Sequence, residues 1–323
     1  MVKVSQSRIG TWKRCGYCHY LKYVLRIRKK GKVRPLYFGS DFHYLLEHYD
    51  HPKDLTNVKK AFSKIKKAYD KLSAKELTDI GGNYLNELQT IFKDYKYVYL
   101  PLETDTRELD FEIELRKDVL IRGKIDAIVE TDNNIIIVEH KTFNKKPNSI
   151  VFDMNSQALI YAKVVRLLGY PSKPIKILWD YIHSKPAEEP PIVDGKLKLN
   201  KSSKIIPQSF RRAAMKVGWD KKEARNKSLE YLGNMENFFF RKEVMVFDSA
   251  IDSFWEDTMQ DIKMIYKFGE TCKSKNITRD CSWCDYQPIC VLELNGGDVK
   301  GLIESQYEIK EEDNECSKTS KAD

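Results

Sequence analysis

Two carboxylates and a lysine occupy the segment of the chain with the strongest strand character. Asp126 and Glu139 lie 13 residues apart in GKIDAIVETDNNIIIVEHKT, on two predicted strands joined by a TDNN turn. Lys141 follows Glu139 by two positions, so its side chain leaves the same face of the strand. Hard oxygen ligands suit Mg²⁺ or Mn²⁺, and a neighbouring ammonium can stabilise developing negative charge. Because phosphodiester hydrolysis needs this combination, the segment predicts metal-dependent hydrolysis of phosphodiesters.

Other residues could support this centre, although each has a simpler interpretation. An E-x-K tripeptide alone is common, but the preceding IIIV strand and the upstream G-x-I-D favour a functional role. His43, in GSDFHYLLE, could add an imidazole ligand, and a lone histidine could equally be structural. Gln157 and Tyr161 share one helix face, from which they could contact a DNA backbone or position Lys141. A helix with a half-buried tyrosine fits the same spacing.

The elements that must hold these residues indicate a mixed α/β (α+β) fold. FEIEL, VLIRGKIDAIVE and NIIIVEHK predict a short antiparallel meander with a buried central strand. MNSQALIYAKVVRLLG predicts a helix that ends at Gly169, and PIKILWDYIH predicts a further strand. Three strands, a helix and a strand in this order predict a central mixed β-sheet flanked by helices.

The remaining segments predict additions to that core. A helix is expected from about Ser40, and residues 50–100 predict a helical insertion broken at Gly81-Gly82. Residues 184–207 predict a surface loop, and FFFRKEVMVF predicts a break or strand between helices. We expect a single domain over residues 1–305 and a disordered tail over 306–323, where polar and charged residues leave little to bury.

Composition limits the possible classes of protein. The 323 residues carry a formal net charge of +9 with a pI near 8.9, which suits a polyanionic partner such as DNA but is weak support alone. No apolar run approaches a membrane span and the N-terminus has no signal-peptide character, so we expect a cytoplasmic protein. The seven cysteines are then better interpreted as metal ligands or free thiols than as disulfides. No Walker A sequence is present, so any helicase activity must be supplied by another protein.

Cysteines gather at two distant places in the chain. Cys281, Cys284 and Cys290 form a C-x2-C-x5-C run, and Cys15 lies more than 260 residues upstream. Thiolates at such spacings predict a metal-bound clasp that joins the two ends, through either an iron–sulfur cluster or a structural zinc ion. The zinc alternative uses Cys15, Cys18, Cys281 and Cys284.

Taken in order, these short motifs resemble the PD-(D/E)XK nuclease superfamily, in its RecB-like, phage-type exonuclease branch. The opening SQSRIGTWKRC is also similar to the branch's S-x-S-R-[LI]-x-x-[YW]-x-x-C-P, with Gly16 in place of the proline. The resemblance covers roughly residues 5–292. For the family's acidic position Glu108 is the best match, and Glu103 and Glu112 are alternatives. The family pattern is matched by Gly39 to His43, Glu108, Gly123 to Asp126, Glu139 to Lys141 and Gln157 to Tyr161.

The resemblance implies a restriction-endonuclease-like core, divalent metal chemistry and DNA as substrate. It assigns catalytic or metal-binding roles to His43, Asp126, Glu139 and Lys141, and it adds the main-chain carbonyl of His140 as a metal ligand. Related AddB and CRISPR-associated nucleases bind a [4Fe–4S] cluster between segments that correspond to residues 5–20 and 270–292. The implied cluster ligands are Cys15, Cys281, Cys284 and Cys290, which leaves Cys18, Cys272 and Cys316 unused.

We therefore expect a Mg²⁺- or Mn²⁺-dependent deoxyribonuclease. The favoured role is an exonuclease that acts on DNA ends or single strands in phage or bacterial recombination and repair, in the bacterial or phage-infected host cytoplasm. An end-trimming or endonucleolytic CRISPR-associated type of nuclease is one alternative. A DNA-binding scaffold that keeps the fold without cleaving is another.

Overall fold

The computed structural model describes residues 1–31, 33–104, 106–148, 152 and 155–310. In this part of the chain, a six-stranded mixed sheet has the order β1-β4-β5-β6-β9, and β3 pairs with β4 off this path. β1 with β4 and β5 with β6 are parallel pairs, whereas the other pairs are antiparallel. The predicted mixed sheet and its β3–β4–β5 meander are therefore confirmed. The strands are β1 (Val2–Val4), β3 (Thr106–Arg116), β4 (Val119–Glu130), β5 (Ile135–Phe143), β6 (Ile175–His183) and β9 (Phe239–Val246).

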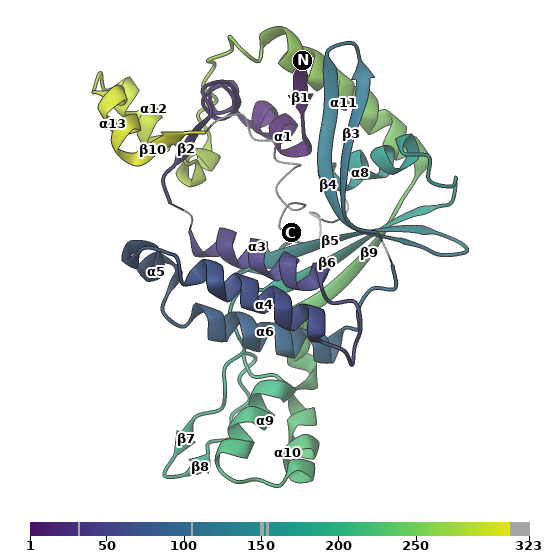
Figure 1. Cartoon of the computed structure of the whole chain (residues 1–323), viewed down its shortest axis with the longest axis vertical. Helices are drawn as coiled ribbons and strands as arrows, with labels where there is room; N and C mark the ends of the chain where they lie inside the picture. Colours follow the sequence, from purple (N-terminus) through teal and green to yellow (C-terminus); the bar gives the residue numbers. More distant parts are fainter. Residues whose placement is uncertain (32, 105, 149–151, 153–154, 311–323) are drawn as a thin grey trace.

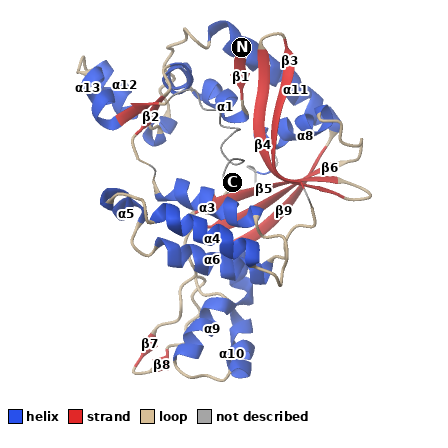
Figure 2. Cartoon of the chain, viewed as in Figure 1, coloured by secondary structure: helices blue, strands red, loops and turns tan. Residues whose placement is uncertain are grey.

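Helices cover both faces of the sheet (Figures 1 and 2). On one face, α8 and α11 bury apolar residues such as Val164 and Ile262 against the sheet. On the other face, α3 and α6 form a second core that includes Phe42 and Leu88, and α4 packs on α3. Among the described helices, none is both long and apolar enough to cross a membrane. The helices of these layers are α1 (Gln6–Arg14), α3 (Arg34–Glu47), α4 (Thr56–Tyr69), α5 (Ala74–Ile80), α6 (Tyr84–Val98), α8 (Ser156–Leu167) and α11 (Asp248–Phe268).

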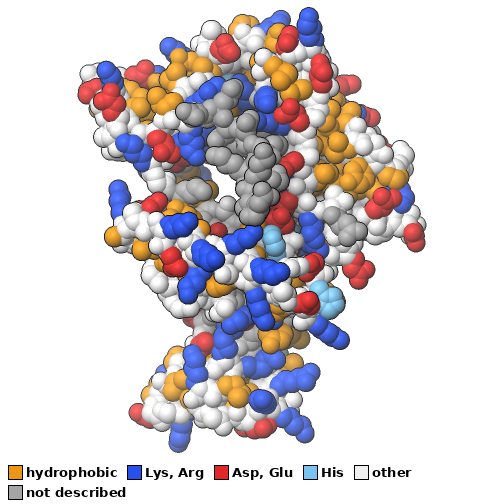
Figure 3. Space-filling model, in the orientation of Figure 1, with side chains coloured by type: hydrophobic (Ala, Val, Ile, Leu, Met, Phe, Trp, Pro, Cys, Tyr) orange, Lys and Arg blue, Asp and Glu red, His pale blue; other side chains and the backbone are white. Residues whose placement is uncertain are grey.

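The segment predicted as a helical insertion contains α4, α5 and α6. Gly81, with a φ of +96°, follows the last residue of α5, as the double glycine suggested. The helix expected from about Ser40 instead begins at Arg34, because Pro35 lies in its first turn, where a proline removes no helical hydrogen bond. Lys and Arg side chains gather over this helical layer on the face shown in Figure 3.

A small lobe separates β6 from β9. It has its own core, in which Phe210 stacks on Tyr231 with ring centroids 5.2 Å apart. The expected loop over residues 184–207 was wrong in part, because it contains a hairpin. Asp194 and Gly195 both have positive φ, of 49° and 72°, as a tight two-residue hairpin turn requires. The lobe contains β7 (Ile192–Val193), β8 (Lys196–Leu197), α9 (Pro207–Lys216), α10 (Lys221–Ser228) and the 3₁₀ segment η2 (Leu229–Asn237).

The two ends of the described chain meet in a third core. β10 pairs antiparallel with β2, and Tyr307, which is 2% exposed, packs beside Tyr286. The expected disordered tail was therefore wrong at its start, because residues 307–309 pair with β2 and bury Tyr307. Residues 311–323 lie outside the described residues. These ends comprise α2 (Gly16–His19), the π-helical η1 (Tyr20–Val24), β2 (Ile27–Lys29), the 3₁₀ segment η3 (Arg279–Trp283), α12 (Gln287–Leu294), α13 (Val299–Gln306) and β10 (Tyr307–Ile309).

Candidate active site

The candidate active site lies where β4 changes partners. β3 follows one edge of β4, while β1 pairs with residues 119–121 and β5 with residues 127–130. Asp126 therefore lies at a fork, directly before the point where β5 joins β4. The His140 backbone N–H donates a hydrogen bond to the Oδ2 atom of Asp126 over 2.8 Å. A carboxylate side chain thus replaces a strand carbonyl as the acceptor at the fork.

Glu139 and Lys141 lie on the same face of β5, as strand alternation predicts. Glu139 is only 1% exposed, and its Oε2 atom accepts hydrogen bonds from Lys141 Nζ at 2.8 Å and from Gln157 Nε2 of α8 at 2.9 Å. Its second oxygen, Oε1, is buried and has no hydrogen-bond partner among the described residues. Leaving such an acceptor unsatisfied costs about 1–3 kcal/mol or more. The Oε1 lone pairs are therefore suited to a cation.

Glu108, His43 and Asp126 form a further set of possible metal ligands. One ligand atom from each lies within 4.8 Å of the others, and this is the only such group of three among the described residues. The Nδ1 atom of His43, on α3, lies 3.5 Å from Asp126 Oδ1. α3, which is distant in sequence from the β3–β4 hairpin, therefore brings His43 to the two carboxylates at the fork.

The backbone of β3 is strained at Glu108. This residue lies across from Asp126 and has a φ of +47°, in the left-handed region that L residues rarely adopt. Such a conformation costs on the order of 1–3 kcal/mol, and outside turns it is enriched at functional sites. Of the two alternatives for the family's acidic position, Glu112 pairs with Lys3 at 3.5 Å and Glu103 is exposed. Glu108 is the one that the structure places beside Asp126.

Burial and mutual repulsion control the ionisation of these side chains. Burial, and then the Asp126 charge, raise the pKa of Glu139 to about 8. The same two causes raise the pKa of Glu108. Burial acts upward on Asp126 as well, but His43, His140 and Lys141 together outweigh it and the pKa of Asp126 falls to about 2. The carboxylates in turn raise the pKa values of His43 and Lys141 against the effect of burial. A cation placed among the acids would compete with the proton that burial holds on Glu139.

A family model described as the PD-(D/E)XK nuclease superfamily matches residues 3–291 of this chain. The chain belongs to this superfamily. Two solved structures are similar to it: a candidate exonuclease from Eubacterium rectale (13% identity, 87% of each chain covered, TM-score 0.45) and the protein SSO0001 (13% identity, 81% of this chain and 97% of that chain, TM-score 0.31). At these TM-scores neither similarity supports a conclusion about activity. None of the curated proteins matches the chain significantly.

Packing explains the glycine of the superfamily's G-x-I-D motif in this chain. A Cβ atom at Gly123 would lie 2.7 Å from Cζ of Phe111, its cross-strand partner on β3. The Phe111 ring meets Tyr161 of α8 edge-on at 5.9 Å, and burial raises the pKa of the Tyr161 hydroxyl. Tyr161 therefore supports the helix that presents Gln157. Gln157 itself contacts the Glu139 carboxylate, which is a contact that the sequence did not specify.

The opposite face of β5 carries a buried polar network that no sequence motif predicts. Asp180 of β6 is 0% exposed and accepts hydrogen bonds from His140 Nδ1 at 2.9 Å, from Arg241 Nε at 3.2 Å and from the Tyr95 hydroxyl of α6. Arg241 also donates to the Tyr95 oxygen over 3.0 Å. Burial opposes ionisation of Asp180, but these donors hold its pKa below the usual range. The network fixes the residue whose amide contacts Asp126.

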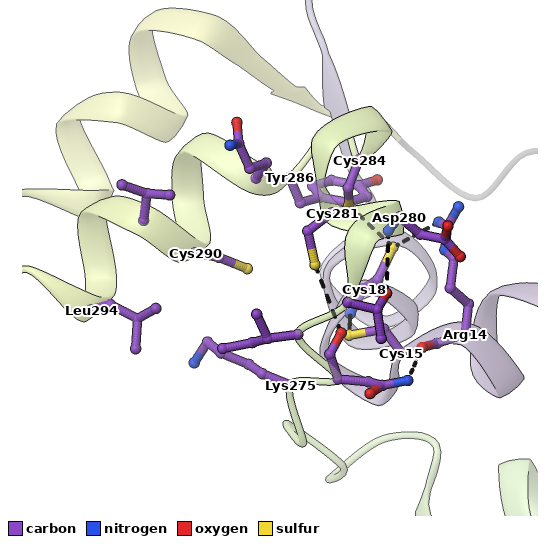
Figure 4. A pocket seen from close by; sticks show the side chains of 15 residues that line it. Arg14, Cys15, Cys18, Lys275, Asp280, Cys281, Cys284, Tyr286, Cys290 and Leu294 are labelled. Atoms are coloured by element: carbon purple, nitrogen blue, oxygen red, sulfur yellow. Dashed lines mark hydrogen bonds between the residues drawn. The ribbon is translucent and has the colours of Figure 1, made fainter.

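Five cysteines line one cavity at the junction of the chain ends (Figure 4). Its volume is about 230 Å³. The Cys18 and Cys284 sulfurs are 4.0 Å apart, and an Arg14 N–H points at Cys18 Sγ over 3.3 Å. All four predicted clasp ligands are therefore brought together, and Cys18 joins them. The lining thiols are Cys15, Cys18, Cys281, Cys284 and Cys290.

Hydrogen bonds to main-chain carbonyls hold the two walls of this cavity together. The Tyr17 N–H donates to the carbonyl of Ser274 over 2.8 Å, and the Tyr286 hydroxyl donates to the carbonyl of Ile27 over 2.7 Å. A Cβ atom at Gly16 would lie 2.6 Å from the sulfur of Cys272. The glycine that replaces the branch's proline therefore makes room for a further thiol beside the cavity. Cys316 lies outside the described residues.

Proposed function

We propose that this superfamily member is a Mg²⁺- or Mn²⁺-dependent nuclease that hydrolyses phosphodiesters in DNA. The observation that carries the proposal is the orphaned Oε1 atom of Glu139, buried beside Asp126 and the Lys141 ammonium. Asp126, Glu139 and the His140 carbonyl would hold the ion, with His43 and Glu108 as additional ligands from the group around Asp126. When bound, the ion supplies Lewis-acid activation and neutralises phosphate charge.

The side chains around the carboxylates have separable tasks. Gln157 and Lys141 share Glu139 Oε2, so they fix the orientation of this carboxylate. The raised pKa of Lys141 keeps its ammonium charged at neutral pH. A fixed cation at this place would stabilise negative charge that develops on the phosphate during hydrolysis. Asp126, held by the His140 N–H, stays ionised in the same pH range.

Cleavage of a labelled linear duplex in the presence of Mn²⁺ tests this assignment. Glu139→Ala is expected to lose cleavage, whereas Glu112→Ala, on the same sheet but paired with Lys3, is expected to retain it. Equal degradation by the wild type and Glu139→Ala would show that the centre is assigned to the wrong residues. DNA binding by the wild type with no metal-dependent cleavage would favour the scaffold alternative.

We infer that the nuclease acts on DNA ends or single strands in recombination or repair. The motif series similar to the RecB-like branch supports this choice. Residues 1–323 contain no Walker A motif, so any helicase activity coupled to this nuclease would lie outside these residues. Circular and linear substrates of the same sequence distinguish the alternatives. Cleavage of linear DNA alone supports the exonuclease, and cleavage of closed circles supports the endonucleolytic type.

We also propose that the cysteine cavity binds a [4Fe–4S] cluster through Cys15, Cys281, Cys284 and Cys290. Its volume and its five thiols support this choice. In a tetrahedral zinc site with bonds of about 2.3 Å, sulfurs lie roughly 3.8 Å apart. Among the described cysteines, no three sulfurs lie within 4.8 Å of one another, so the lining is wider than a single ion requires. When bound, the cluster supplies a rigid four-thiolate cross-link.

Anaerobic purification followed by iron and sulfide analysis tests the cluster. The wild type is expected to be brown and to bleach on oxidation, and Cys290→Ser is expected to lose iron. Cys18→Ser provides a matched control, because Cys18 lines the same cavity without being one of the four proposed ligands. If the wild type is colourless and contains zinc, and the Cys18→Ser variant has lost that zinc, the zinc alternative is established instead.

A further inference from the structure

One helix of the insertion has an unusual charge composition. α4 carries five lysines and no acidic residue in 14 residues. Val58, Ala61 and Ile65 are buried on one side of the helix. At 100° per residue the lysines fall on the opposite side, and each of them is exposed. This lysine face consists of Lys59, Lys60, Lys64, Lys66 and Lys67.

The positive charge of the lysine face is not neutralised by salt bridges within the described part of the chain. Lys60 and Lys64, at i and i+4, repel each other by about 0.2–0.5 kcal/mol. None of the five lysines forms an ion pair within 4.0 Å of a described acidic residue. α11 differs, since Asp248, Asp252 and Asp261 pair with basic residues of neighbouring elements, as Asp261 does with Lys13 at 3.1 Å. A helix face that carries only positive charges, with no salt bridges to neutralise them, is suited to binding a polyanion.

The spacing along α4 suits a phosphate backbone. Lys60, Lys64 and Lys67 form a row of about 10 Å at 1.5 Å per residue. Duplex DNA carries one negative charge per roughly 1.7 Å of its axis, so such a row spans several phosphates. α4 packs on α3, the helix that presents His43 to the candidate active site. Lys and Arg side chains gather over this helical layer on the face in Figure 3.

We propose that the lysine face of α4 binds the sugar–phosphate backbone of the DNA substrate outside the active site. This inference rests on the proposed function, because it assigns the substrate of that site a second contact region. The contact is electrostatic and independent of sequence, since lysines that meet phosphates position a nucleic acid without reading its bases. It therefore contributes to affinity for long substrates and leaves the hydrolytic step unchanged.

The test compares two charge-matched triple variants. Lys60, Lys64 and Lys67 are replaced by Gln in the first, and Lys117, Lys263 and Lys267, which are exposed on the β3–β4 turn and on α11, are replaced by Gln in the second. Binding of a labelled duplex is measured in EDTA, so that turnover cannot interfere, between about 50 and 200 mM salt. Hydrolysis of a small chromogenic phosphodiester with Mn²⁺ reports on the active site alone.

For the α4 variant we expect the slope of log K against log salt to become shallower by about two to three, and affinity at the lowest salt to fall roughly tenfold or more. Hydrolysis of the small phosphodiester should not change, and the control variant should bind as the wild type does. A wild-type slope in the α4 variant, or an equal loss in both variants, would overturn the proposal. If the wild type cleaves nothing, the proposed function fails, and the binding measurement still decides the role of α4.

Discussion

The hydroxyl of Tyr95 is expected to influence the active site from the far side of the sheet. It donates to the fully buried Asp180 carboxylate and accepts a hydrogen bond from Arg241 over 3.0 Å. A hydrogen bond to a charged group contributes about 1.5–3 kcal/mol. Tyr95→Phe removes this donor and leaves an Arg241 N–H without its acceptor. We therefore expect the free energy of unfolding to fall by about 1.5–3 kcal/mol.

The same substitution should also weaken metal binding. Asp180 holds the His140 ring at 2.9 Å, and the His140 amide holds Asp126 at 2.8 Å. Outer residues that orient metal ligands commonly contribute 10–100-fold to metal affinity. Tyr95→Phe leaves the other two donors to Asp180 in place, so we expect a loss of about tenfold in apparent Mn²⁺ affinity.

Tyr69→Phe provides a matched control within the same insertion. The Tyr69 hydroxyl donates to the carbonyl of Gly81 over 3.4 Å, a long and neutral hydrogen bond in a partly buried position. Its loss should cost less than about 1 kcal/mol and leave the Mn²⁺ requirement unchanged. Urea unfolding and the Mn²⁺ dependence of phosphodiester hydrolysis provide the two measurements. If Tyr95→Phe and Tyr69→Phe have the same stability and the same Mn²⁺ requirement, the network does not position the site.

Three further perturbations test the site from other directions. The folded-state pKa of Glu139 is about 8, whereas its unfolded value is about 4.3, so the folded state binds more protons between these two values. Stability measured in EDTA should therefore fall as pH rises through this window. Thermal melts of Glu139→Gln should show a smaller fall over the same pH range. Gly123→Ala forces a Cβ atom against the Phe111 ring and should cost about 1–3 kcal/mol in urea unfolding. Glu108→Gly relieves the positive φ, so it should be about 1 kcal/mol more stable than Glu108→Ala while both bind Mn²⁺ more weakly, as calorimetry would show.

The sequence was sufficient for the core because its signals are local. Alternation in FEIEL and the apolar run before Glu139 identify β3 and β5 without knowledge of their partners. The two-residue spacing of Glu139 and Lys141 likewise fixes their common face. The Asp194-Gly195 turn was also a local signal, and the hairpin it forms could have been found from the sequence.

The rest of the site depends on contacts between distant segments. Asp180 and Tyr95 are separated by 85 positions, and nothing in ILWDYIH distinguishes Asp180 from a residue at a solvent-facing position. The placement of Glu108 beside His43 likewise joins β3 to α3, a helix that lies far upstream in the chain. Sequence motifs therefore identify which side chains belong to the site. Tertiary packing decides which of their atoms are hydrogen-bonded and which, such as Glu139 Oε1, remain available to bind a cation.

β1 and α1, at the start of the chain, connect the cysteine cavity to the fork at Asp126. β1 pairs with Val119–Ile121 of β4 and borders the fork opposite β5. β1 leads directly into α1, and the carbonyl of Arg14 at the end of α1 accepts a hydrogen bond from Asn276 over 3.0 Å. A cross-link between Cys15 and the C-terminal thiols would restrain α1 and, through it, β1. Because that restraint would act on a strand paired with Val119–Ile121, the segment of β4 that leads to Asp126, the proposed cluster would stabilise the active-site geometry without taking part in the reaction.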